Sequence, residues 1–451
     1  MRKYFGTDGI RGLANSDPMT VENALRLGRA VAFTFGASSR SRPKILVGKD
    51  TRLSGYMLES ALVAGITSTG ADVILLGPIP TPGIAYLTTS MRAEAGIVIS
   101  ASHNPYEDNG LKVFGHDGFK LPDDVEAALE LRMESELEHP DLARGADIGR
   151  ARRIEDANGR YITHLKALLH DTFDLDGLRI VVDCANGAGY RAAPAVFEEL
   201  GAEVIPLGVH PNGLNINASC GSLHPECCAE AVRRHGADLG VALDGDADRL
   251  ILLDERGDVV DGDAILALCG LHLHQERRLR GPTVVATVMS NLGLEHALAS
   301  EGVGLVRTAV GDRYVVQHMR ETGLNFGGEQ SGHLVFLDHA TTGDGIAAAI
   351  QVLNVMLSRQ RPLSELSGIM QRVPQVLVNR AVSSKRPVEE LPASQALMAN
   401  LERSLAGRGR LLVRYSGTES KIRVMVEGED EARIREMAED LADTLVKELD
   451  R

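Results

Sequence analysis

The chain has 451 residues, of which 44% are hydrophobic and 24% are charged, and its formal net charge is −14. This composition is typical of a globular protein and excludes a disordered or collagen-like chain. The acidic balance, without a basic stripe, opposes binding to nucleic acid or to anionic membranes. A chain of this length exceeds one hydrophobic core, so we expect several domains that meet around a shared cleft.

Cysteine usage and the N-terminal segment indicate the compartment. The five cysteines are an odd number without a CxxC pair, which favours buried thiols in a reducing compartment over a disulfide framework or a zinc site. Segment 1–12 has charges and glycines where a secretion signal needs an apolar core, and no run is long enough to span a membrane. We therefore expect a soluble, cytoplasmic protein without membrane or nucleic-acid partners.

Short β-branched runs at 44–48, 72–77, 96–100, 179–183 and 239–243 alternate with helix-like segments. Strands separated by helices predict βαβ units, and hence an α/β fold with largely parallel sheets.

The other predicted elements divide the chain into four units. The charged stretch 122–154 is predicted to be helical and strandless, and an amphipathic helix at 161–169 begins a second unit. A polar, proline-containing connection at 372–390 precedes a β-hairpin at 410–428 and a helix at 429–449. The predicted domains are 1–155, 156–256, 257–372 and 373–451.

A turn of glycine, aspartate and arginine follows a strand in each of the first three units: GKDTR at 48, GDADR at 245 and GDR at 311. A diverged internal repeat would produce this pattern, but such turns are also common on their own.

The segment GIVISASHNPYEDNGLKVFG contains an apolar strand that leads into Ser102, and its second strand carries Lys112. A serine at a strand end, in a turn whose backbone N–H groups point outward, is well placed to bear a phosphoryl group. A simple structural turn is the alternative interpretation. His103 follows the serine, but no G-x-S-x-G elbow surrounds it, so an acyl-transfer triad is not favoured.

Asp244, Asp246 and Asp248 alternate directly after a strand in GVALDGDADRLILLD. Three carboxylates on one loop suit Mg²⁺, which prefers oxygen ligands, and Arg249 beside them could neutralise phosphate charge. The spacing also mimics an EF-hand calcium loop, but an arginine stands where that loop needs a glycine, and strands flank it. A solvated acidic turn is the other alternative.

The segment FGGEQSGH, residues 326–333, has paired glycines that let backbone approach a ligand closely. Glu329 and Ser331 offer groups that grip sugar hydroxyls, and His333 could act as a general acid or base. A glycine-rich turn that caps a helix is the alternative.

Two further turns offer cations. RYSGTES combines a guanidinium, two hydroxyls and flexible backbone in Arg414, Ser416, Gly417 and Thr418, which suits an anion cradle. GTDGIRG adds Arg11 in a glycine-rich turn. Either motif could instead be an ordinary surface turn.

A loose G-x-G-x-x-A match in VVDCANGAGYRAAP places Gly187, Gly189 and Ala192 after a strand. No acidic residue stands clearly at the end of the next strand, so a dinucleotide site is not favoured.

Taken in order, GTDGIRG, SASHNP, DGDADR, GEQSGH and RYSGTE resemble the motif set of the α-D-phosphohexomutase superfamily over essentially the whole chain. Five ordered motifs are far more specific than any one of them. MRKYFGTDGIRG, SASHNPYEDNGLKVFGHDGFKL and GLNINASCGSLHPE resemble its phosphoglucosamine mutase branch in particular. Tyr415, Ser420 and Leu223 depart from the residues that relatives often have.

The resemblance implies three α/β domains with mixed sheets between helices, plus a smaller α+β C-terminal domain, around a central cleft. It implies an isomerase that interconverts glucosamine 6-phosphate and glucosamine 1-phosphate through a 1,6-bisphosphate and feeds UDP-N-acetylglucosamine synthesis. A phosphomannomutase or phosphoglucomutase on the same scaffold is the nearest alternative, and a non-catalytic sugar-phosphate-binding or calcium-binding protein is a more distant one. A monomer or a homodimer is expected.

The resemblance also implies residue roles. Ser102 matches the family's phosphoserine, which would bind Mg²⁺ together with Asp244, Asp246 and Asp248. Glu329 and Ser331 match the sugar-hydroxyl loop, and Arg414, Ser416, Gly417 and Thr418 match the loop that holds the distal phosphate. Arg11, Lys112, Arg249 and His333 match polar groups around the transferring phosphoryl, with Lys112 or His333 removing the hydroxyl proton.

Overall fold

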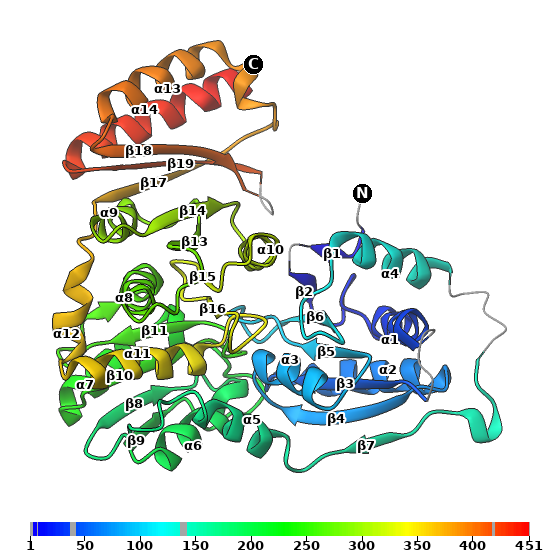
Figure 1. The fold of residues 1–451 in the computed structure, drawn as a ribbon. Coiled ribbons are helices and arrows are strands. Elements are labelled where there is room, and N and C mark those ends of the chain that lie inside the picture. Colours follow the sequence, from blue (N-terminus) through cyan, green and yellow to red (C-terminus); the bar gives the residue numbers. More distant parts are fainter. Residues whose placement is uncertain (1–2, 7, 37–41, 136–141, 417–419, 451) are drawn as a thin grey trace.

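The computed structural model describes residues 3–6, 8–36, 42–135, 142–416 and 420–450. The described strands form four sheets, of seven, five, four and three strands, and each sheet has helices packed on it. Figure 1 shows the first domain beside the second and third domains, and the fourth domain stacked on the third.

The first sheet has the order β1-β2-β6-β5-β3-β4-β7. Its β3, β4, β5 and β7 are parallel, whereas β1, β2 and β6 pair antiparallel. The strands are β1 (Phe5–Gly6), β2 (Gly9–Leu13), β3 (Lys44–Lys49), β4 (Asp72–Pro78), β5 (Ala95–Ile99), β6 (Asp108–Gly115) and β7 (Ala151–Arg153). The helices are α1 (Val21–Gly36), α2 (Gly55–Ser68), α3 (Thr81–Ser90) and α4 (Asp123–Ser135).

The second sheet has the order β12-β11-β10-β8-β9, with β8, β9 and β10 parallel and the other two strands antiparallel. Its strands are β8 (Arg179–Asp183), β9 (Glu203–Leu207), β10 (Leu239–Leu243), β11 (Leu250–Leu253) and β12 (Val259–Val260). The helices are α5 (Ala157–Lys166), α6 (Ala192–Glu199) and α7 (Glu226–His235).

The third sheet has the order β14-β13-β15-β16, and only β16 runs antiparallel. Its strands are β13 (Thr283–Thr287), β14 (Gly304–Thr308), β15 (Phe326–Gly328) and β16 (Leu334–Phe336). The helices are α8 (Gly262–Gln275), α9 (Leu292–Ser300), α10 (Asp312–Thr322), α11 (Gly345–Arg359) and α12 (Leu363–Leu366).

The fourth sheet, β17-β19-β18, is wholly antiparallel, so the mixed architecture expected from the family resemblance is confirmed. Its elements are β17 (Gln375–Ala381), α13 (Pro392–Leu405), β18 (Gly409–Tyr415), β19 (Lys421–Gly428) and α14 (Glu431–Leu449). The apolar side chains of α14 recur at helical spacing and are buried against this sheet.

Two sequence predictions were wrong. The stretch 122–154 is not strandless, because β7 pairs with β4, although all three β7 residues are exposed. The segment 372–390 is not only a connection, because β17 lies within it and pairs with β19 along its full length.

The first three sheets share one arrangement, in which a parallel strand turns back into an antiparallel one. The turns join β5 to β6, β10 to β11 and β15 to β16, and they contain residues 100–107, 244–249 and 329–333. GKDTR and GDR instead follow β3 and β14, which occupy different places in their sheets. The repetition therefore lies in strand order, and the Gly/Asp/Arg turns do not occupy equivalent positions, which favours the alternative that such turns are common on their own.

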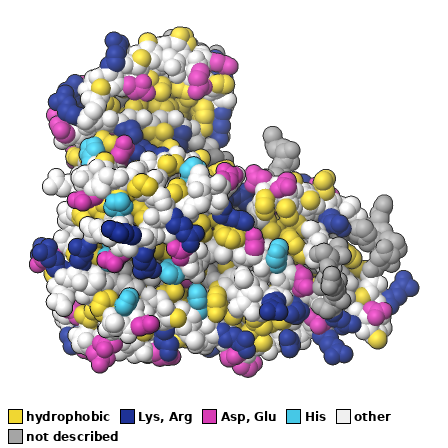
Figure 2. Space-filling view, in the orientation of Figure 1, with side chains coloured by type: hydrophobic (Ala, Val, Ile, Leu, Met, Phe, Trp, Pro, Cys, Tyr) yellow, Lys and Arg dark blue, Asp and Glu magenta, His cyan; other side chains and the backbone are white. Residues whose placement is uncertain are grey.

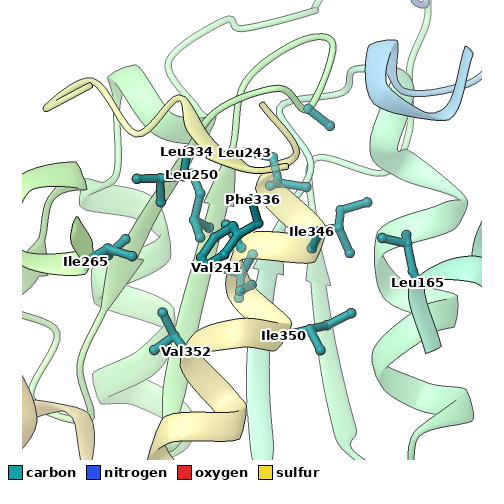
Figure 3. Close-up of a cluster of buried hydrophobic side chains, with 14 of the residues drawn as sticks. Leu165, Val241, Leu243, Leu250, Ile265, Leu334, Phe336, Ile346, Ile350 and Val352 are labelled. Carbon is teal, nitrogen blue, oxygen red and sulfur yellow. The ribbon is translucent and has the colours of Figure 1, made fainter. Parts of the chain in front are cut away.

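One continuous hydrophobic core joins the first three domains. Figure 3 shows part of it, where Leu165 of α5, Val241 of β10, Ile265 of α8 and Phe336 of β16 surround Ile350 of α11. Helix α11 is apolar on nearly all sides, which is typical of a helix buried between layers. The three domains are thus packed as one body.

The fourth domain has a hydrophobic cluster of its own and joins the third through polar contacts. The buried Glu427 carboxylate accepts from Asn291 Nδ2 at 3.1 Å and from the Leu292 backbone N–H at 3.1 Å. Arg410 donates to Glu427 at 2.8 Å and to the Ser290 carbonyl at 2.8 Å.

Candidate active site

Ser102 lies in the turn between β5 and β6 with its side chain buried. Its backbone φ of 51° is in the left-handed region, which non-glycine residues rarely adopt. The Ser102 hydroxyl donates to Asp244 Oδ2 at 2.5 Å, across the boundary between the first two sheets. The serine turn and the acidic loop, which the sequence identifies separately, therefore form one site.

Asp244, Asp246 and Asp248 lie in the turn between β10 and β11, and one carboxylate oxygen from each falls within 4.8 Å of the others. All three side chains are buried, and Asp246 Oδ1 and Asp248 Oδ1 have no hydrogen-bond partner among the described residues. Clustered oxygens that lack donors fit a cation such as Mg²⁺. The strands on both sides exclude the helix-flanked EF-hand.

Neighbouring cations compensate the negative charge of Asp248 much more than that of Asp244. Burial raises the pKa of Asp244 well above its ordinary value, and the charges of Asp248 and Asp246 add to the effect. Burial also acts to raise the pKa of Asp248, but Lys112, His333 and Arg249 hold it well below its ordinary value. A cation beside Asp244 would relieve this repulsion.

Lys112 reaches the acidic loop from β6. Its Nζ lies 2.9 Å from Asp246 Oδ2, 3.3 Å from Asp8 Oδ2 and 3.6 Å from Asp248 Oδ2. Burial acts to lower the pKa of Lys112, but these carboxylates raise it above its ordinary value. Lys112 is therefore an ammonium cation at neutral pH.

Arg11 and Arg249 lie on either side of this centre. Arg11 pairs with Asp8, and Arg249 Nε lies 4.0 Å from Asp248 Oδ1. The Nε atoms of both arginines are buried and have no acceptor among the described residues. Both guanidiniums thus retain a donor for an anionic ligand.

His333 lies at the end of the turn between β15 and β16 and is 2% exposed. Its Nδ1 is 3.7 Å from Asp248 Oδ2, and its Nε2 accepts from the Gly343 backbone N–H at 3.0 Å. Burial acts to lower the pKa of His333, but Asp312 and Asp248 raise it above the ordinary value. The third domain therefore contributes a titratable group to the acidic loop.

The sequence motifs do not single out Asp8, Lys120 and Asp312 as site residues. Lys120 Nζ lies 2.5 Å from Asp8 Oδ1 and also pairs with Asp312, whose Oδ2 is 3.3 Å from His333 Nε2. These contacts connect the first domain to the third. Asp8 stands in a glycine-containing turn and Asp312 follows Gly311 at the start of α10, which was an available signal, whereas Lys120 had none.

The turn with Glu329 and Ser331, residues 329–333, lies beside the acidic loop, residues 244–249, which is called the metal loop from here on. Leu250 of β11 donates through its backbone N–H to the Gly332 carbonyl at 3.0 Å. Glu329 Oε1 accepts from the Gly311 N–H at 3.1 Å, and the Glu329 charge contributes to raising the pKa of Arg249 against the opposing effect of burial. Ser331 is exposed.

The glycines of the dinucleotide-like motif have a different role. A Cβ on Gly187 would lie 2.3 Å from the Gly245 carbonyl oxygen, and the Ala188 N–H donates to that oxygen at 2.7 Å. This turn therefore supports the metal loop by close backbone packing and does not have the open space that a pyrophosphate needs.

Arg414 lies on β18 of the fourth domain, directly opposite Arg423 of β19. Burial and the neighbouring Arg423 charge lower the pKa of Arg414. Arg423 Nη2 donates to Ser416 Oγ at 3.4 Å, and Lys385 Nζ donates to the Ser416 carbonyl at 2.7 Å. Figure 1 shows these strand ends on the side facing α10 and the first domain. The predicted residues Gly417 and Thr418 lie outside the described residues.

Family models match the chain from end to end. They are described as phosphoglucomutase/phosphomannomutase, with α/β/α domain I at 2–140, domain II at 159–257, domain III at 261–373 and the C-terminal domain at 377–444. The chain belongs to the phosphoglucomutase/phosphomannomutase family. This membership confirms the resemblance seen in the five ordered motifs.

Individual relatives of this phosphoglucomutase/phosphomannomutase chain are similar over their full lengths. A protein from an Anaeromyxobacter species named phosphoglucosamine mutase is 60% identical over 452 residues, covering 99% of this chain and 96% of the relative. A crystal structure of a phosphoglucomutase/phosphomannomutase family protein from Burkholderia thailandensis has a TM-score of 0.80 at 24% identity, covering 97% of this chain and 96% of the other. Aspergillus fumigatus N-acetylphosphoglucosamine mutase, in complex with GlcNAc-6P and magnesium, has a TM-score of 0.66 at 18% identity, covering 99% and 96%.

Adding Mg²⁺ to metal-free protein is expected to raise the unfolding temperature, because a ligand that binds only the folded state stabilises it. Asp246→Asn removes one ligand charge and should require at least about tenfold more Mg²⁺ for the same rise. A MgCl₂ titration followed by differential scanning fluorimetry measures both. Asp258→Asn, at an exposed aspartate after β11, is the matched control, and an unchanged titration in Asp246→Asn would contradict the metal assignment.

Proposed function

We propose that the chain is a phosphoglucosamine mutase, which interconverts glucosamine 6-phosphate and glucosamine 1-phosphate and so feeds UDP-N-acetylglucosamine synthesis. The observation that carries the proposal is the buried Ser102 hydroxyl, which donates at 2.5 Å to an acidic loop whose carboxylates Lys112 and Arg249 also approach. The name and full-length identity of the Anaeromyxobacter relative support the amino sugar. The enzyme is an isomerase of the phosphohexose mutase type.

A resident Mg²⁺ on Asp244, Asp246 and Asp248 is part of the proposal, since the donor-free carboxylate oxygens fit that ion. Ser102, or the phosphate that it carries, is the proposed further ligand. When bound, the ion would neutralise charge on the phosphoryl oxygens.

Ser102 is the proposed phosphoryl carrier in both halves of the reaction. In the first half, the bond between Ser102 Oγ and phosphorus breaks while a sugar hydroxyl oxygen bonds to phosphorus, and the hydroxyl proton passes to a side chain. The product is glucosamine 1,6-bisphosphate. After this intermediate turns end for end, Ser102 Oγ accepts the other phosphoryl and the sugar oxygen recovers a proton. Because such transfers pass through a loose transition state, the protein contributes mainly positioning and charge.

The cations around Ser102 divide between two proposed duties. Lys112, held by three carboxylates, is suited to stabilising the transferring phosphoryl as a fixed positive charge. Arg11 and Arg249, whose Nε donors have no acceptor within the part of the chain that the structure describes, are suited to binding its oxygens. Because Lys112 stays protonated, His333 is the favoured one of the two proposed proton acceptors.

The sugar and its distal phosphate need separate binding groups. Glu329 and Ser331 are the proposed ligands of the sugar hydroxyls, on the turn that adjoins the metal loop. Arg414 and Ser416, with Gly417 and Thr418, are proposed to hold the distal phosphate. An anion between Arg414 and Arg423 would relieve the repulsion between the two guanidiniums, which supports this assignment.

A small sugar phosphate is the expected partner. In Figure 2, positive and negative side chains are interspersed on the face shown and form no continuous basic stripe there. That no nucleic acid binds remains a prediction. Among the described residues, no helix is both long and apolar enough to cross a membrane. A cytoplasmic location and a monomeric or dimeric state remain predictions, as do the four domain boundaries.

Replacing Ser102 by alanine should abolish the phosphate on the enzyme and reduce turnover by several orders of magnitude, because it removes the proposed phosphoryl carrier. Intact mass and phosphopeptide mapping locate the phosphate, and a coupled assay with bisphosphate and magnesium measures turnover. Ser60→Ala, at an exposed serine of α2, is the control. Robust turnover by Ser102→Ala would refute the phosphoserine scheme.

Arg414→Ala should raise KM for the sugar phosphate about 10- to 100-fold with little change in kcat, because a charge-assisted contact to the non-reacting phosphate is lost. Arg435→Ala, on the exposed face of α14, is the matched control. A loss confined to kcat would argue against a distal phosphate clamp.

Specificity is tested by comparing glucosamine, glucose and mannose phosphates under identical conditions. The proposed function predicts the highest kcat/KM for glucosamine 6-phosphate. A higher value for mannose or glucose phosphate would favour the phosphomannomutase or phosphoglucomutase alternative on the same scaffold.

A further inference from the structure

Two sequence motifs have no part in the proposed chemistry but meet beneath the Ser102 turn. GKDTR ends at Arg52, just before α2 in the first domain, and GLNINASCG contains Asn217 in the second domain. Both side chains donate hydrogen bonds to the same two carbonyl oxygens, those of Ser102 and Asn104.

The Ser102 turn needs such restraint because its backbone is strained. A serine in the left-handed region is strained, and this conformation persists only when its surroundings fix it. The direction of the Ser102 side chain follows from that backbone conformation. If φ returned to the ordinary region, Oγ would leave Asp244.

Arg52 is fully buried, and its guanidinium lies against the Ser102 turn. A guanidinium has five N–H donors, and hydrogen bonds occupy all five. The acceptors are Asp50 Oδ2 at 2.7 Å, the Ser102 carbonyl at 2.9 Å, the Asn104 carbonyl at 2.8 Å, the Asp108 carbonyl at 3.0 Å and the Pro105 carbonyl. A single side chain therefore holds three backbone carbonyls of the turn and a fourth at the start of β6.

Asn217 holds the same turn from the second domain. Its Nδ2 donates to the Ser102 carbonyl at 2.9 Å and to the Asn104 carbonyl at 3.0 Å. Its own backbone, with φ of 59°, is fixed by a hydrogen bond from its N–H to the Ala185 carbonyl at 2.9 Å. The buried Asp183 anchors the same loop by accepting from the Gly221 N–H at 2.7 Å.

The metal loop also packs closely against the Ser102 carbonyl. A Cβ built on Gly245 would lie 2.6 Å from the Ser102 carbonyl oxygen and 2.8 Å from Asn217 Nδ2. Gly245 stands between Asp244 and Asp246, so a shift of the Ser102 turn changes its distance to the metal loop directly. The Ser102 carbonyl is thus the point at which both domains fix the reacting hydroxyl.

We propose that Arg52 and Asn217 are positioning residues, which together hold Ser102 in its strained conformation so that Oγ stays aligned for phosphoryl transfer. The inference rests on the proposed function and extends it. Neither residue needs to touch the substrate. Their loss therefore affects the transfer step, where a misplacement of about 1 Å can cost about 100-fold in rate, more than it affects substrate binding.

Asn217→Gly is the decisive variant, because glycine retains the left-handed backbone without strain and removes only the amide donors. The expected result is a kcat about 10- to 100-fold lower, with KM within about threefold of wild type. Asn217→Asp, which sets a carboxylate oxygen against two carbonyls, should lower kcat at least as far. Single-turnover transfer from phosphorylated enzyme to sugar phosphate should slow by the same factor.

Two variants in the same loop serve as controls. Ser219→Gly adds glycine at another exposed left-handed position, and Asn212→Asp adds a charge at an exposed asparagine. Both should behave as wild type. A wild-type kcat in Asn217→Gly, a change confined to KM, or an equal loss in Ser219→Gly would overturn the proposal.

Arg52→Lys tests the positioning role of Arg52. Lysine keeps the positive charge, but it lacks the planar guanidinium that donates to four carbonyls at once. It should lower kcat more than Asn217→Gly, and normal kcat would contradict the assignment. If Arg52→Lys does not fold, the Asn217 series still decides. Absence of phosphate on wild-type Ser102 would refute the proposed function, whereas the Asn217 comparison bears on positioning alone.

Discussion

The burial of three carboxylates in one turn is the constraint on which the rest of the structure depends. Buried charges are costly unless they are paired, and Asp244, Asp246 and Asp248 lie within a few ångströms of one another. Partial compensation comes from Lys112 of the first domain and His333 of the third. Each of the first three domains therefore contributes charged groups to the site, and the site exists only while these three domains keep their relative positions.

Packing fixes the relative positions of these domains. Helix α11 belongs to the third domain but lies within a core shared with the second, and its first residue, Gly345, donates to the Ala247 carbonyl in the metal loop. The backbone contact of Gly187 with Gly245 supports the same loop from the other side. Electrostatic repulsion inside the turn is thus resisted by apolar packing and close backbone contacts outside it.

The sequence predicts β3, β4, β5, β8 and β10 because buried parallel strands are rich in β-branched residues. It does not predict β7, whose three residues are all exposed and which joins the sheet through backbone pairing alone. In β17, Leu377 is exposed while Val376 and Val378 are buried, so the apolar alternation is obscured. Four of the five predicted motifs meet in one site, those with Arg11, Ser102, Asp244 and His333, whereas the part of the Arg414 motif that the structure describes has its hydrogen bonds within the fourth domain. The individual residue roles remain predictions. Contacts such as those of Arg52 and Lys120 join segments far apart in the chain, so no local pattern could reveal them.

The contrast between the shared core and the polar junction at Glu427 bears on how the family can diversify. Exchange of any of the first three domains between relatives would require an apolar interface to be rebuilt across several layers, with each mismatch leaving a cavity or a clash. Exchange of the fourth domain has to match mainly a small set of directional contacts around Glu427, Asn291 and Arg410. Recombination can therefore replace the C-terminal module while it leaves the catalytic body intact.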